Sequence, residues 1–228
     1  MPSWIMHLAT ADCVSRQLKI NKNDFMFANI MPDMNVGWII KSKNKIDYTI
    51  THKAKKQKLE NKEFLLPDIE EFKVKYYNKL NNPVILGYWV HLLTDYFWNR
   101  LTFSKYFVYN NNNEFVGVKN KDNIIQCCKE KARYMKQKDF REFENYLVHT
   151  QKITIPYETK EILQQASQIE EIIINEDDIK KAIDFLTQAK KVSESANGSH
   201  YQMFQQDELI KYYEESVQFI LNKMKIAM

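Results

Sequence analysis

A histidine and an aspartate lie four residues apart in the most apolar stretch of the chain, Val84 to Trp98. Within it, the segment Gly-Tyr-Trp-Val-His-Leu-Leu-Thr-Asp contains His91 and ends at Asp95. On a helix these two residues lie one turn apart on the same face. A carboxylate in apolar surroundings needs a partner that compensates its charge. A metal ion bound by imidazole nitrogen and carboxylate oxygen is one such partner. A hydrogen bond from His91 to Asp95 without a metal is the other, and these residues alone do not decide between the two.

Three further polar residues occupy positions where apolar residues are expected. His7 falls in a stripe with helical spacing over 3–19, which it shares with Trp4, Ala11, Val14 and Leu18. Asp33 follows Met-Pro just beyond a short helix expected over 24–30. His52 falls on the apolar side of an alternating segment, 46–52, which predicts a short extended segment. Taken singly, each is explained as a core histidine or a turn residue. Taken together, they are more simply explained as one site.

The order of these residues resembles the zinc-dependent phospholipase C family. The resemblance covers roughly residues 1–100. It rests on a histidine in a first helix, an Ile-Met-Pro-Asp turn, a Thr-His pair and a Gly-Tyr-x-x-His-x-x-x-Asp helix. It implies that Asp33, His52, His91 and Asp95 surround one zinc ion, and that Asp95 bridges to a second metal that His7 also binds. It also implies an all-α fold, a compact multi-helix bundle of the type shared with zinc-dependent single-strand nucleases, with at most a small β-hairpin.

Two features of that family are missing from the chain. Secreted members use an N-terminal tryptophan whose amine helps to hold a metal, whereas Trp4 is internal. Members also place a histidine about six residues after the helix aspartate, followed by a His-x-x-x-Glu group. Here Leu101 stands at that position, and the sequence contains no His-x-x-x-Glu. The expected centre therefore has one or two zinc ions, with manganese or iron as alternatives, and not three.

The ligand types and the resemblance together imply the hydrolysis of a phosphodiester or phosphomonoester, such as a phospholipid head group. Zinc held by histidines and carboxylates keeps a position open for water and lowers the pKa of that water toward neutrality. Asp33 is the expected catalytic residue, a ligand that also accepts a proton from the water. A nuclease on the same fold and a non-catalytic, metal-stabilised helical interaction module are the alternatives.

Other residues that could do chemistry are less specific. His149 falls near the end of a helix and His200 in a polar loop, and such histidines are usually solvated. Seven lysines between Lys41 and Lys58 bracket His52. They could attract a phosphate toward a metal, but a solvated face is the simpler interpretation.

The composition favours helices in a single domain over residues 1–228. The apolar fraction of 44% is ample for a core, while four glycines and five prolines are too few for the many tight turns of a sandwich or barrel. The remaining patterns predict helices over 65–80, 83–100, 122–149, 157–174, 176–191 and 207–225, with a small hairpin around 114–118. The net charge of +4 is mild, so no stable nucleic-acid partner is expected.

The sequence also gives expectations about location. The three cysteines are odd in number and lack zinc-ribbon spacing, which favours a reducing compartment. The first residues lack the pattern of a signal peptide, and the stretch from Val84 to Trp98 is shorter than the about 20 residues of a membrane span. We therefore expect a cytoplasmic protein. Its oligomeric state stays open.

Overall fold

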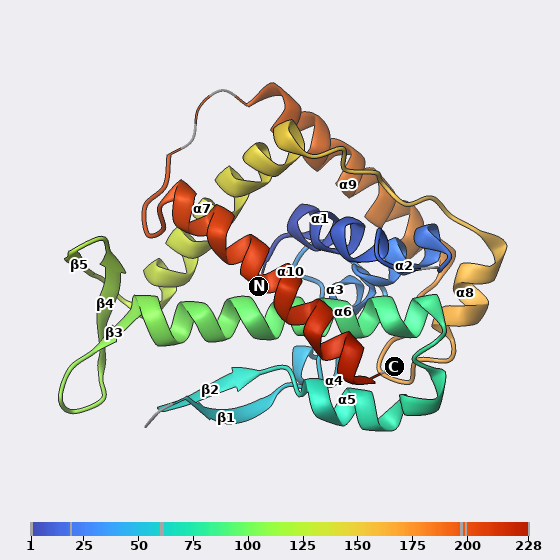
Figure 1. Cartoon of the computed structure of the whole chain (residues 1–228), viewed down its shortest axis with the longest axis horizontal. Helices are drawn as coiled ribbons and strands as arrows, with labels where there is room; N and C mark the ends of the chain where they lie inside the picture. The colour runs from blue at the N-terminus through green and yellow to red at the C-terminus, as the bar shows by residue number, and fades with distance from the viewer. Residues whose placement is uncertain (1, 19, 60–61, 197, 199, 228) are drawn as a thin grey trace.

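Two helices buried on almost every side form the centre of the protein, α1 (Trp4–Ser15) and α6 (Pro83–Leu101). The structure is a computed structural model that describes residues 2–18, 20–59, 62–196, 198 and 200–227. Figure 1 shows α6 running across the molecule with α1 beside it. A helix that is apolar all round has to be enclosed by other elements, and the other helices of the chain provide that enclosure.

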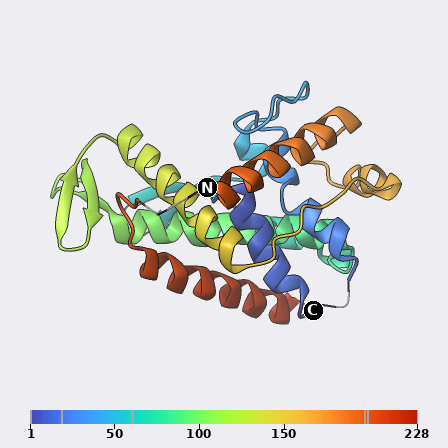
Figure 2. The same ribbon diagram turned by 90° about the horizontal axis from the view of Figure 1, so that it is seen from above.

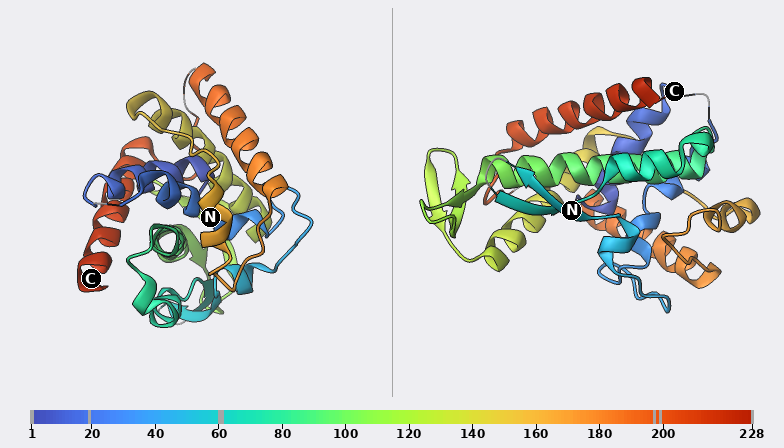
Figure 3. Two further views of the ribbon diagram at one scale, coloured as in Figure 1. Left: turned by 90° about the vertical axis from the view of Figure 1, so that its right-hand side faces the viewer. Right: turned by 90° about the horizontal axis from the view of Figure 1, so that it is seen from below.

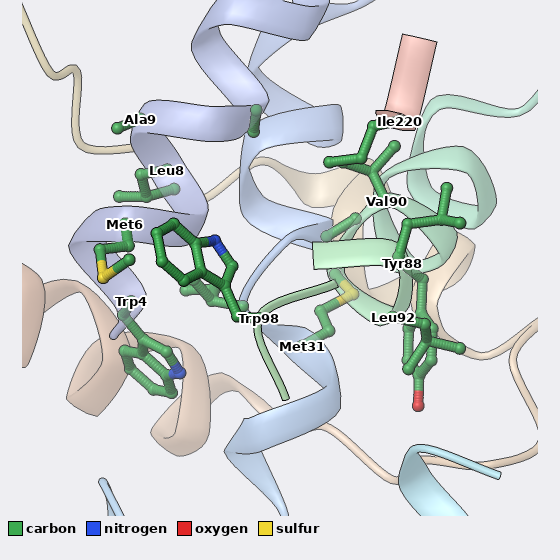
Figure 4. Close-up of a cluster of buried hydrophobic side chains, with 14 of the residues drawn as sticks. Trp4, Met6, Leu8, Ala9, Met31, Tyr88, Val90, Leu92, Trp98 and Ile220 are labelled. Carbon is green, nitrogen blue, oxygen red and sulfur yellow. The ribbon is translucent and has the colours of Figure 1, made fainter. Parts of the chain in front are cut away.

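Every residue of α1 except Cys13 is buried. The helix begins at Ser3, whose hydroxyl accepts a hydrogen bond from the Met6 backbone N–H at 3.2 Å. It contacts α2, α6, α7, α9 and α10. Figure 4 shows Trp4, Met6 and Leu8 of α1 in one cluster with Trp98 of α6. His7 is thus on a helix with no solvent-facing side.

α6 begins at Asn82, whose side chain accepts a hydrogen bond from the Val84 backbone N–H at 2.8 Å, with Pro83 at the first turn. It continues into a π-helical turn, η2 (Thr102–Tyr106). α2 (Lys22–Ala28) packs along α6. Their backbones approach so closely at Gly87 that an added Cβ would lie 2.7 Å from Ala28 Cβ and closer still to the Phe25 carbonyl oxygen.

Short elements follow α2 and carry the chain toward α6. They are α3 (Met31–Met34), α4 (Tyr48–Thr51), α5 (Ile69–Lys75) and the 3-10 helix η1 (Tyr77–Lys79). The segment 46–52, expected to be extended, instead contains the single helical turn α4. The cause is Asp47, whose carboxylate accepts a hydrogen bond from the Thr49 backbone N–H at 2.8 Å and so starts a turn.

Four helices complete the enclosure: α7 (Lys129–Thr150), α8 (Lys160–Ala166), α9 (Glu176–Ser195) and α10 (Gln206–Ala227). Figures 2 and 3 show α10 along one side of α6 and α9 toward the opposite side. The buried Asp139 of α7 accepts hydrogen bonds from the backbone N–H groups of Gln202, Met203 and Phe204, at 2.7 to 2.9 Å. This contact ties the segment before α10 to α7.

The fold also contains two small antiparallel sheets, so the expected all-α bundle with at most a small hairpin is wrong and the fold is a helix-rich mixture of α and β. One sheet pairs β1 (Lys55–Leu59) with β2 (Lys62–Leu66). The other has the order β3-β4-β5, formed by β3 (Phe107–Tyr109), β4 (Phe115–Asn120) and β5 (Asn123–Gln126), and it lies beyond the C-terminal end of α6 (Figure 1). β1 and β5 are mostly exposed, so neither has the buried apolar face that would mark it in the sequence.

Because of the strands, some helices have boundaries that differ from those predicted from the sequence. The helix expected from 122 begins only at Lys129, because β5 occupies the residues before it. The helix expected over 65–80 is divided into the end of β2, α5 and η1, and the one expected over 157–174 is reduced to α8. Among the described residues, none of the helices combines the length and apolarity needed to cross a membrane. The single domain over 1–228 stays a prediction.

The contact at Gly87 generates the first prediction. Gly87→Ala should lower the free energy of unfolding by about 1–3 kcal/mol, because the added methyl group has to push α2 away from α6. Chemical denaturation of both proteins measures the difference. Glu214→Ala, an exposed change in α10, serves as the control and should stay within about 0.5 kcal/mol of the wild type. Equal stability of Gly87→Ala and wild type would show that the backbones do not approach this closely.

Candidate metal centre

Five side chains meet in the centre of the molecule, and each is at most 1% exposed: His7, Asp33, His52, His91 and Asp95. His52 Nε2 lies 3.4 Å from an oxygen of Asp33, 3.4 Å from an oxygen of Asp95 and 3.1 Å from His91 Nε2. His7 Nε2 lies 3.5 Å from the other oxygen of Asp95. His91 Nε2 lies 4.0 Å from both carboxylates. The structure thus brings together all five residues that the sequence predicts as ligands.

Four different elements supply these side chains. His91 and Asp95 lie one turn apart on α6, and His7 projects from α1 so that its ring stacks on that of His91 with a centroid distance of 3.9 Å. Asp33 lies in the single turn α3, and His52 is the residue that ends α4. The packing of α1 and α3 against α6, and of α4 against α3, therefore determines the spacing of the group.

Hydrogen bonds from outside the group orient three of its members. Asn29 offers its backbone carbonyl to His91 Nδ1 at 2.7 Å. A carbonyl can only accept, so His91 Nδ1 carries the proton and the neutral ring has a lone pair on Nε2. Thr51 Oγ1 lies 2.8 Å from His52 Nδ1. Trp4 Nε1 donates to Asp33 Oδ2 at 3.1 Å. Such outer contacts are what fix metal-binding histidines and carboxylates in place.

Two members of the group are carboxylates that stay ionised although they are buried. Burial alone would raise the pKa of Asp33 and of Asp95, but the facing histidines outweigh it and hold both pKa values below the ordinary range. Burial, with His7 close by, lowers the pKa of His91 to about 3. At neutral pH His91 is therefore uncharged beside two ionised carboxylates. Deprotonated carboxylates and neutral imidazoles are the states in which these side chains bind metals.

Several polar atoms of the group have no hydrogen-bond partner among the described residues. They are both ring nitrogens of His7, Oδ1 of Asp33 and both carboxylate oxygens of Asp95. A buried polar atom without a partner costs about 1–3 kcal/mol, and more if it is charged. Native proteins seldom leave so many in one place, and a cation would satisfy the carboxylate oxygens together with one ring nitrogen of His7.

The distances also fit metal ions. Two atoms each about 2.1 Å from one tetrahedral zinc ion are about 3.4 Å apart, and the separations within the group run from 3.1 to 4.0 Å. Ligand atoms within 4.8 Å of one another form two sets, one of His7, His91 and Asp95 and one of Asp33, His52 and His91. The sets share His91, whose single lone pair on Nε2 can bind one ion, so the residues could hold one ion with His91 and a second one only through the other members of the sets.

The other residues considered from the sequence lie elsewhere. His149 and His200 are exposed and belong to neither set. Six of the seven lysines between 41 and 58 are exposed, and the seventh, Lys53, pairs with Glu71 at 2.7 Å and with Glu171 at 3.3 Å. These lysines form a largely solvated face.

A cavity of about 1370 Å³ lies beside the centre. Trp4 and Tyr48 line it, and both also touch ligand residues, Trp4 by its hydrogen bond to Asp33 and Tyr48 by stacking on His52 at 4.0 Å. Burial and the carboxylates of Asp95 and Asp33 raise the pKa of Tyr48 well above its ordinary value, so its phenol stays protonated. The sequence did not single out Tyr48, because an aromatic residue in an apolar pattern gives no separate signal.

The two ligand sets generate the second prediction. Elemental analysis of protein purified without chelator should find one or two zinc ions per chain. His91→Gln should lose at least one of them because Nε2 of His91 belongs to both sets, whereas His7→Gln should lose at most one. The exposed His149→Gln is the matched control and should bind as much zinc as the wild type. Zinc at a hundred times its Kd should also raise the free energy of unfolding by about 2.7 kcal/mol. Full zinc content in His91→Gln would contradict a centre built on that residue.

Comparisons with known protein families, with curated proteins and with solved structures find no match to this chain. The arrangement of the five side chains is therefore the basis for assigning a function.

Proposed function

We propose that the protein is a zinc-dependent phosphoesterase that hydrolyses a phosphodiester or phosphomonoester. The observation that carries this proposal is the convergence of three imidazoles and two carboxylates, several of whose buried atoms lack a hydrogen-bond partner among the described residues. The resemblance of residues 1–100 to the zinc-dependent phospholipase C family agrees with it. When bound, zinc supplies Lewis acidity, which acidifies water and stabilises negative charge on a phosphoryl group.

The chain's own residues would orient the reactants. His7, His52, His91 and Asp95 would hold the metal, with His91 fixed by the Asn29 carbonyl. Trp4 holds one oxygen of Asp33 and leaves Oδ1 without a partner among the described residues. We assign to this oxygen the acceptance of a proton from the attacking water. The protonated phenol of Tyr48, between the centre and the cavity, can donate a hydrogen bond to a phosphate oxygen.

One observation favours a second candidate, a non-catalytic module that zinc stabilises. All five ligands are buried, and a structural zinc site is closed whereas a catalytic one keeps a position open. Under our proposal Tyr48 is what closes the centre, because its ring stacks on His52 at 4.0 Å and on the exposed Trp38 at 5.5 Å. The cavity on the far side of Tyr48 is the route by which a substrate would enter.

The third prediction concerns activity. Zinc-loaded protein should hydrolyse bis(p-nitrophenyl) phosphate, chelation should abolish the reaction, and zinc or manganese should restore it. The rate should rise through near-neutral pH as water at the metal ionises. Asp95→Asn should reduce kcat/KM by more than the about 10–100-fold that loss of an outer-shell partner costs.

Lys56→Ala is the control for that assay, since Lys56 is exposed on β1 and should leave the rate unchanged. Fully metallated protein should also be assayed on a phosphomonoester, a phospholipid and single-stranded DNA, which separates the substrate classes. Absence of turnover on every one of these substrates would establish the non-catalytic module in place of the enzyme.

The fourth prediction concerns access. Tyr48→Ala should speed the transfer of zinc from the protein to an excess of chelator by about tenfold or more, because it removes the ring that separates the centre from the cavity. Ile50→Ala changes an exposed residue of the same short helix and should not alter the rate. Equal rates for Tyr48→Ala and Ile50→Ala would mean that the route to the centre does not pass Tyr48.

A further inference from the structure

A lysine in the wall of the cavity, Lys136 of α7, is only 4% exposed. Among the described residues no carboxylate lies within ion-pair distance of its ammonium group. Lys136 Nζ donates a hydrogen bond to Asn99 Oδ1 at 3.3 Å, and the rings of Phe103 and Phe140 lie 5.8 Å away. A neutral amide and two aromatic rings compensate a buried charge only in part. The ammonium group can therefore still bind an anion.

The lysine lies close to the candidate metal centre. Its partner Asn99 follows Asp95 by one turn of α6, and Asn99 and Lys136 both line the cavity. Burial lowers the pKa of Lys136 below its ordinary value, and the Asp95 carboxylate acts in the opposite direction. The two sites thus interact electrostatically, although Lys136 belongs to neither set of metal ligands.

The rest of the cavity wall also favours an anion. It contains five basic side chains and three glutamates, and Lys129, Arg133 and Arg141 extend the basic face along α7 on either side of Lys136. One of the glutamates, Glu144, has a pKa raised to about 7 by burial, so it is only partly ionised at neutral pH. Phe64, Phe103 and Phe107 provide an apolar wall.

We propose that Lys136 and Asn99 form an anion-binding subsite for a phosphate or carboxylate group of a ligand with an apolar body. Lys136 supplies the charge, and the Asn99 side chain positions its ammonium group. The phosphate and the carboxylate share this chemistry, so they are tested as separate probes. If the proposed phosphoesterase function holds, on which this extension rests, the substrate has a second anionic group besides the phosphate that reacts.

The binding test uses zinc-loaded protein and two probes, inorganic phosphate and glutarate, titrated by calorimetry. Wild type should bind at least one of them, and Lys136→Met should weaken that binding by about tenfold or more, since it removes the charge and keeps an unbranched side chain. Lys136→Arg should restore most of the affinity. Lys119→Met, an exposed change on β4, is the matched control and should bind as wild type does. The same affinity in Lys136→Met as in wild type, or no binding of either probe to wild type, would overturn the subsite.

A second variant keeps the test independent of how Lys136→Met folds. Asn99→Asp has nearly the shape of the wild type and places a carboxylate beside Lys136, where it takes the role of the anion. It should weaken binding of the same probe by about tenfold and raise the Tm, because the buried ammonium group gains an internal partner. Unchanged binding in Asn99→Asp would count against the subsite even if Lys136→Met did not fold.

The substrate extension is tested separately with two p-nitrophenyl diesters that differ only in whether the other arm ends in a carboxylate. Wild type should prefer the carboxylate diester in kcat/KM, and Lys136→Met should lose that preference, whereas the exposed control Lys119→Met should keep it. An equal loss on both diesters would overturn the second anionic group. If neither diester is hydrolysed, the phosphoesterase proposal and this extension fail, and the binding result still decides on the subsite.

Discussion

Asp33 and Asp95 carry two negative charges that are buried side by side, and the residues packed around them have to accommodate these charges. Among the described residues neither carboxylate has a lysine or arginine within ion-pair distance, and their close neighbours are imidazoles, of which His91 is neutral at pH 7. Charges of this kind stay buried only when a partner compensates them. Contacts from outside the group orient the side chains that would bind such a partner. The Asn29 carbonyl accepts a hydrogen bond from His91, Thr51 lies beside His52, and Trp4 donates a hydrogen bond to Asp33. Because other helices enclose α1 and α6, solvent water does not compensate the charge of these carboxylates.

The site was more predictable from the sequence than the fold. His7, His91 and Asp95 interrupt apolar patterns with helical spacing, and a polar residue in such a pattern has to face the interior whatever the rest of the chain does. His52 was found for the same reason, although its element was assigned wrongly, because the side chain of Asp47 replaces the expected extended backbone with a turn. The residues therefore converge in the structure despite an error in secondary structure, and their role as metal ligands stays a prediction.

The sheets and the cavity depend on contacts between distant residues, which a periodic pattern does not contain. β1 is rich in lysine and largely exposed, so its pairing with β2 is visible only in three dimensions. Lys136 lies four residues from both Ala132 and Phe140 of α7, so spacing could have placed it on the buried face of that helix, but Asn99, its hydrogen-bond partner, is 37 residues away in the sequence. Spacing along α6 could have suggested Asn99 as a further site residue, since it continues the face of His91 and Asp95. Nothing in the sequence indicates that α7 brings a buried cation to Asn99.

That face of α6 sets a fixed distance between two parts of the protein. His91, Asp95, Asn99 and Phe103 follow one another at intervals of four residues, from the metal ligands through the partner of Lys136 to the apolar wall of the cavity. Each interval advances about 6 Å along a helix axis. Because α6 carries His91, Asp95 and Asn99 and continues directly into η2 with Phe103, the separation between the centre and Asn99 is fixed before any ligand arrives. A ligand would then be selected by the length between its charged groups as well as by their chemistry, and shorter or longer molecules would engage only one end.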